Sequence, residues 1–148
     1  MIQEHKELLL KDLCARLPYK VKISIPELFT NKEQVETLNE IFKGNDDLYR
    51  VNDSGILIEY IKPYLFPLSS MTDKQEKEIQ EIVGNPDNAC IIRKTDGLEL
   101  WLDFIDTDPT IWVDTIFEVQ DYLNKNHFDY RGLIPMGLAI DATNLNIY

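Results

Sequence analysis

His127, Asp129 and Arg131 alternate with aromatic residues in the segment HFDYRG, residues 127–132. A histidine whose ring is oriented by a carboxylate can act as a general base, and a guanidinium can bind an anionic group. These residue types at this spacing therefore permit acid–base chemistry or anion binding. A small enzyme or ligand-binding protein with its site at these three residues is one hypothesis for the chain.

The same segment also fits a structural role, because it directly follows a predicted long helix. A histidine is favourable at a helix C-terminus, an aspartate readily turns the chain, and Gly132 and Gly137 permit a left-handed backbone. We expect the rings of Phe128 and Tyr130 to hold the following residues against the core. We favour this structural lock over a catalytic site.

A tract of acidic residues without a lysine or arginine runs from Thr95 to Asn124. Its acidic residues are Asp96, Glu99, Asp103, Asp106, Asp108, Asp114, Glu118 and Asp121. Such an excess of one charge creates a negative face that can steer and bind a basic protein surface. Trp101 shares a predicted strand face with Glu99 and adds an aromatic side chain of the kind that dominates many interfaces. We predict that a partner binds at Trp101 and at the acidic residues from Glu99 to Asp121.

Two other interpretations of the acidic tract remain open. Asp103, Asp106 and Asp108 could converge on Ca²⁺ or Mg²⁺ at a strand-to-helix turn, but the tract lacks the regular ligand spacing of an EF-hand loop. The carboxylates can also form a solvated face that only keeps the protein in solution. The sequence has no phosphate-binding or dinucleotide-binding glycine loop and no HExxH, GxSxG or CxxC motif. We therefore expect neither a metal nor another cofactor.

The composition predicts one folded domain over residues 1–148 and a cytoplasmic location. With 44% hydrophobic residues the chain can fill a core, and its length is that of a single domain. A net charge of −11 repels phosphate backbones, so we expect no direct binding to nucleic acid. No apolar run reaches the roughly 20 residues that cross a membrane. Cys14 and Cys90 are expected to be buried thiols in a reducing compartment.

The hydrophobic periodicity predicts an α+β fold with about three helices and a small antiparallel sheet built from hairpins. The first helix directs Leu9 and Leu13 toward the core, carries Asp12 and Arg16 on its polar side, and ends at Pro18.

The other two helices are predicted from their capping residues. Thr72 and Gln75 form a capping box and Gly84 ends that helix, whereas Asp108 as N-cap and Pro109 at the first position begin the third. The apolar stripe expected to bury the third helix consists of Trp112, Ile116, Val119 and Leu123, widened by Val113 and Phe117.

The strands are predicted from alternation and turn residues. Residues 19–25 alternate as one strand, and residues 48–61 and 89–105 each form a β-hairpin around a tight turn. Residues 62–68 contain two prolines, which favour an edge strand or a connector. Residues 31–43 fit a helix or a strand equally well.

Three segments of the chain resemble a known family. They are ELLLKDLCARLPYKVK at residues 7–22, IKPYLFPLSSMT at 61–72 and YLNKNHFDYRGLIPMGLAIDA at 122–142. They resemble a family of small uncharacterised proteins of gut Bacteroides-type bacteria, their phages and mobile elements. The chain departs from that family at Phe66, where a basic residue is common, and at Pro135-Met136, where an acidic–basic pair is common. The resemblance implies a phage or mobile-element context and transfers no catalytic or binding residue.

The expected function is that of a small acidic accessory protein, not an enzyme, that binds a basic protein surface through its acidic tract. The alternative is an enzyme or ligand-binding protein whose site contains His127, Asp129 and Arg131. A homo-oligomer is compatible with either.

Overall fold

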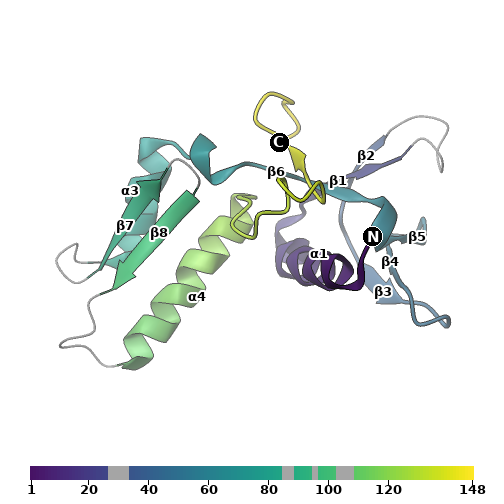
Figure 1. The fold of residues 1–148 in the computed structure, drawn as a ribbon, viewed down its shortest axis with the longest axis horizontal. Coiled ribbons are helices and arrows are strands. Elements are labelled where there is room, and N and C mark those ends of the chain that lie inside the picture. Colours follow the sequence, from purple (N-terminus) through teal and green to yellow (C-terminus); the bar gives the residue numbers. More distant parts are fainter. Residues whose placement is uncertain (27–33, 85–88, 95–96, 103–108) are drawn as a thin grey trace. The chain divides into compact units, whose positions relative to one another are not determined.

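The computed structural model describes residues 1–26, 34–84, 89–94, 97–102 and 109–148, and describes side chains only outside residues 85–112. The chain has the predicted α+β character and divides into two compact units, Met1–Leu65 with Arg131–Tyr148, and Phe66–Tyr130 (Figure 1). Each unit has its own cluster of buried apolar side chains. The sequence length favoured one core, whereas the packing forms two clusters.

The first unit contains a four-stranded sheet with the order β2-β1-β6-β9. The strands are β1 (Lys22–Ile25), β2 (Gln34–Thr37), β6 (Lys62–Leu65) and β9 (Ile140–Asp141). β1 pairs antiparallel with β2 and β6, and β6 pairs parallel with β9. The prediction of an edge strand at residues 62–68 was therefore wrong for β6. The proline is accommodated because β6 pairs with β1 only through Lys62 and Pro63, and with β9 through the two residues that follow.

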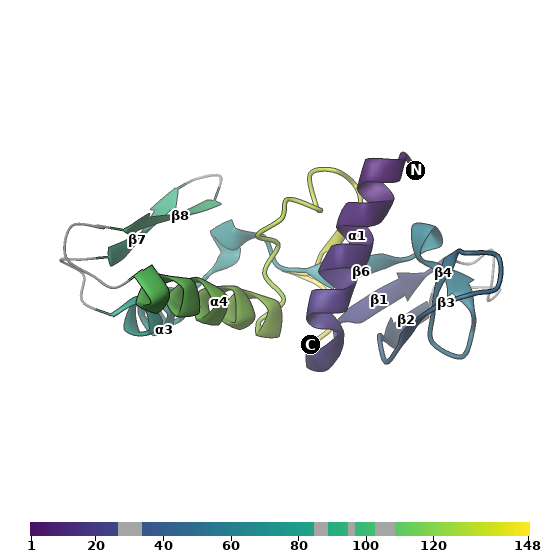
Figure 2. The same cartoon turned by 90° about the horizontal axis from the view of Figure 1, so that it is seen from below.

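Helix α1 (Gln3–Arg16) crosses one face of this sheet (Figure 2). Leu9 and Leu13 are buried against Ile23 and Ile25 of β1, as their periodicity predicts. A 3₁₀ turn, η1 (Leu17–Tyr19), follows α1 at the predicted proline. The expectation of a buried Cys14 thiol was wrong, since Cys14 is exposed, and the side chain of Cys90 lies outside the described residues.

A second, three-stranded antiparallel sheet in this unit has the order β3-β4-β5. Its strands are β3 (Ile41–Lys43), β4 (Tyr49–Val51) and β5 (Ile56–Leu57), and the 3₁₀ turn η2 (Ile58–Tyr60) follows. Where it is described, the ambiguous segment 31–43 therefore forms strands β2 and β3, joined by the non-helical residues 38–40. The predicted tight turn joins β4 to β5, with positive φ at Asn52 (49°) and Gly55 (65°). The side-chain oxygen of Asn52 accepts the Asn39 N–H at 2.9 Å, which fixes the chain between β2 and β3.

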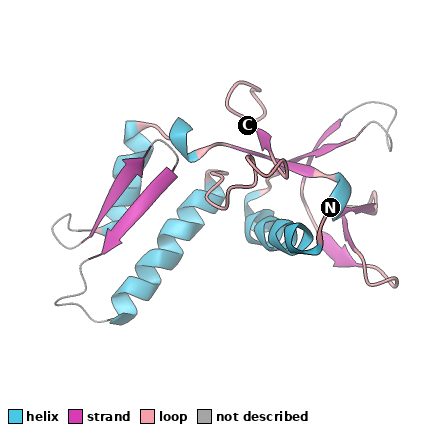
Figure 3. Cartoon of the chain, viewed as in Figure 1, coloured by secondary structure: helices cyan, strands magenta, loops and turns pink. Residues whose placement is uncertain are grey.

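The second unit packs two helices and a hairpin (Figure 3). Its elements are η3 (Leu68–Ser70), α3 (Asp73–Val83), β7 (Ala89–Lys94), β8 (Gly97–Leu102) and α4 (Pro109–Lys125). The capping box of Thr72 and Gln75 forms as predicted, and Gly84 ends α3 with φ of 91°. The second predicted hairpin is also present, because β7 and β8 pair antiparallel from Lys94 and Gly97 outward. Across the described residues, the helices are too short or too polar to cross a membrane.

Candidate functional site

Helix α4 is held by contacts with α3 that fix its rotation about its own axis. Val119 and Leu123 of α4 pack with Ile79 of α3 in the buried cluster of the second unit. The Tyr122 hydroxyl donates a 2.6 Å hydrogen bond to Glu78 of α3. This bond lowers the pKa of Glu78 from its ordinary value, while burial and then the Glu78 carboxylate raise the pKa of Tyr122.

This rotation leaves a row of carboxylates of α4 exposed to solvent. Asp114, Glu118 and Asp121 are all exposed, and their spacing of four and then three residues places them on one helix face. Within the described part of the chain, Asp114 and Glu118 take part in no ion pair. The acidic residues of α4 thus lie together on one exposed face of the helix.

Three large apolar side chains of α4 are also exposed, of which Val113 and Phe117 lie next to the carboxylates around the helix and Ile116 lies farther round, beside Val113. Val113, Ile116 and Phe117 expose 50%, 45% and 62% of their area, respectively. The prediction that these three residues are buried was therefore wrong. It is confirmed for Leu123, which is buried, and in part for Val119, which is partly buried. Near this end of α4 the buried side chain is Thr115, and Ile116 is exposed although it lies seven residues before the buried Leu123, on nearly the same helix face.

The other predicted partner-binding residues cannot be placed in the same way. Glu99 and Trp101 belong to strand β8, but their side chains, like that of Trp112, lie outside the described residues. Four more acidic residues fall wholly outside the described residues: Asp96, Asp103, Asp106 and Asp108. The described residues contain no group of three or more side chains that could hold a metal ion. The metal interpretation of the acidic tract therefore stays untested.

The end of α4 is a Schellman motif built around His127. His127 has a left-handed φ of 58°, its N–H donates to the Asn124 carbonyl at 3.1 Å, and the Phe128 N–H donates to the Leu123 carbonyl at 2.9 Å. Phe128 and Leu123 are buried in the same cluster, which is the apolar contact that accompanies this motif. His127 thus occupies the position that helices usually give to glycine.

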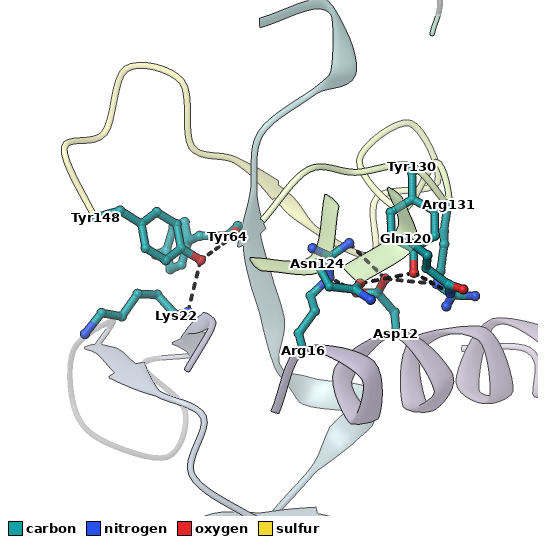
Figure 4. A network of polar contacts seen from close by, with 9 residues as sticks. All are labelled: Asp12, Arg16, Lys22, Tyr64, Gln120, Asn124, Tyr130, Arg131 and Tyr148. Atoms are coloured by element: carbon teal, nitrogen blue, oxygen red, sulfur yellow. Dashed lines mark hydrogen bonds and ion pairs between the residues drawn. The ribbon is translucent and has the colours of Figure 1, made fainter. Parts of the chain in front are cut away.

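The backbone on either side of Phe128 is hydrogen-bonded to Phe66. The Phe66 N–H donates to the His127 carbonyl at 2.9 Å, and the Asp129 N–H donates to the Phe66 carbonyl at 2.8 Å. The side-chain amide of Gln120, on α4, donates a 3.0 Å hydrogen bond to the Tyr130 hydroxyl. That hydroxyl donates to the Asn124 side chain at 3.1 Å (Figure 4). These contacts favour the structural interpretation of the segment.

Arg131 belongs to the other unit, so the three residues of the predicted site are divided between the two units. Its Nε lies 3.2 Å from Oδ1 of Asp12, which also binds Arg16 through two hydrogen bonds of 2.7 and 3.0 Å (Figure 4). Asp12 and Arg16 are fully buried, contrary to the prediction that they lie on the polar side of α1. The available signal was that Asp12 follows Leu9 by three residues and Arg16 follows Leu13 by three residues, the spacing of one helix face.

Tyr148 is hydrogen-bonded to two strands of the four-stranded sheet, β1 and β6, and the sequence did not predict this role. Its hydroxyl donates to the Tyr64 carbonyl at 2.7 Å and accepts the Lys22 N–H at 3.1 Å (Figure 4). Burial raises the pKa of Tyr148 to about 12. Gly132 and Gly137 have φ of 72° and 71°, the left-handed conformation for which they were predicted.

Comparisons of the chain with protein-family models, with curated proteins and with solved structures found no match. The resemblance to a Bacteroides-type family therefore stays a prediction. The functional argument rests on the residues of the chain itself.

Proposed function

We propose that this chain is a small acidic accessory protein of the cytoplasm that acts by binding a basic protein surface. The binding surface is the α4 outer face, which we define as Val113, Asp114, Ile116, Phe117, Glu118 and Asp121. One observation carries the proposal: this helix exposes large apolar side chains beside a strip of carboxylates. Exposed apolar patches rimmed by charge are typical of interaction sites.

The two kinds of side chain contribute differently to such an interface. Carboxylates speed the encounter with a basic partner and select for it, whereas buried aromatic area supplies most of the affinity. Phe117 is the most exposed of the apolar residues, at 62%. Covering about 100 Å² of its surface would contribute roughly 2–3 kcal/mol. Phe117 is therefore the anchor that the proposal assigns to the face.

The biological setting is part of the same proposal. The segments that resemble proteins of phages and mobile elements support a role in that context. The net charge of −11 supports a protein partner rather than direct contact with nucleic acid.

Affinity capture from the native host with matched variants tests the proposal. Glu118→Lys removes a carboxylate from the α4 outer face, and Glu81→Lys makes the same change at an exposed position of α3. We expect a partner captured at about 0.15 M salt to be lost from Glu118→Lys and kept by Glu81→Lys. Phe117→Ala should lose it at every salt concentration. Identical capture by all three variants would contradict the proposal.

A further inference from the structure

The first unit contains a pocket of about 180 Å³ between α1 and residues 47–49 and 57–59. This volume suits one side chain or a small molecule, since a cavity of about 150 Å³ can hold benzene. The apolar residues that line the pocket are Leu10 of α1, Leu48, Tyr49, Leu57 and Ile58. The walls therefore favour a ligand with a short hydrocarbon chain.

The charged groups that line this pocket are mainly carboxylates. The Lys6 ammonium forms an ion pair with Glu59, and Asp47 lies 2.7 Å from the ammonium of Lys43. Glu7 instead accepts a 2.8 Å hydrogen bond from the neutral amide of Gln3. Among the described residues, Glu7 is thus the carboxylate of the pocket that has no cationic partner.

We propose that this pocket binds a primary alkylammonium group. A chain of four or five methylene groups would lie along the aliphatic walls while its ammonium reaches the Glu7 carboxylate, the arrangement by which lysine buries its stem and solvates its charge. Lys6 already places an ammonium against Glu59 in the same pocket. An anionic ligand would instead meet the Glu7 carboxylate, because the Lys6 ammonium of the pocket is already paired with Glu59. This inference is independent of the α4 outer face, which belongs to the other unit.

The alkylammonium group can come from a free diamine or from a lysine side chain of another protein. Amide NMR spectra recorded during titration with 1,5-diaminopentane and with Nα-acetyl-lysine methylamide separate these sources. We expect saturable shifts at Glu7, Tyr49 and Glu59, with half-saturation in the millimolar range. Shifts with the diamine alone support a free amine as the ligand, and shifts with both support a lysine side chain.

Two controls make the titration decisive. The neutral 1-pentanol, at equal concentrations, should leave these amides nearly unshifted. Glu7→Gln should weaken diamine binding about three- to fivefold, whereas Glu4→Gln, at an exposed position of α1 outside the pocket, should not change it. The amide spectrum of each variant reports directly whether it is folded. Equal shifts with pentanol, no saturable shift with either amine, or unchanged affinity in Glu7→Gln would overturn the proposal.

Discussion

Replacing His127 by alanine and by glycine separates the contribution of its side chain from that of its backbone. His127 is 9% exposed and has φ of 58°. Both substitutions remove the imidazole and its packing. Only glycine also relieves the left-handed conformation, which costs other residues about 1–2 kcal/mol. We therefore expect His127→Gly to be more stable than His127→Ala by about 1 kcal/mol.

Chemical denaturation followed by circular dichroism measures this difference. In thermal melts it should appear as about 2–4 °C for a chain of this size. Lys125, the last residue of α4, provides a control with the opposite sign. There the backbone is helical, so Lys125→Gly should be less stable than Lys125→Ala, by about 0.5 kcal/mol because the position is the last of the helix.

The outcome also separates the two hypotheses for this segment. A structural lock predicts that His127→Ala is clearly less stable than the wild type, whereas a residue needed only for chemistry would leave stability nearly unchanged. If His127→Ala proved as stable as His127→Gly, the left-handed backbone would not be the constraint at this position. The reasoning from the Schellman motif would then be refuted.

Three further predictions follow from the packing of each unit. Asp12→Ala leaves the buried guanidinium of Arg16 without its carboxylate, so unfolding by urea should show a loss of about 3–5 kcal/mol; a loss below about 1 kcal/mol would contradict the burial of this cluster. The folded state holds the Tyr148 proton with a pKa of about 12, above the ordinary value of 10.0, so stability should fall as the pH rises from 10 to 12. Tyr148→Phe should reduce that fall, and an unchanged pH profile would count against the assignment. Trp101 and Trp112, the two tryptophans of the chain, both lie in the second unit. If residues 1–148 form one domain, tryptophan fluorescence and circular dichroism should therefore give coincident unfolding curves, and separate curves would show two domains.

The elements that the sequence predicted correctly are those fixed by neighbouring residues. Thr72, Gln75 and Gly84 bound α3 because capping depends on side chains within one turn of the helix end. The turn at Asn52 forms for the same reason, since its left-handed backbone is a local preference of the residue. Pro109 begins α4 because its fixed φ suits the first helical position.

The features that the sequence did not predict depend on contacts between distant segments. Asp12 is buried because Arg131, from the other end of the chain, meets it inside the first unit. Ile116 is exposed although it shares a helix face with the buried Leu123, so its exposure depends on which segments cover that part of α4, and periodicity does not specify this. Pro63 lies in an interior strand because each neighbour of β6 pairs with only half of it. Local patterns contain none of this information.

Photo-crosslinking from position 117 tests the central claim most directly. A photoreactive amino acid in place of Phe117 should give a crosslinked partner in the native host, and the yield should fall as the salt concentration rises. The same group at Glu81, on α3, should give no such adduct. Equal adducts from both positions, or none from position 117, would contradict the assignment of the α4 outer face as the binding surface.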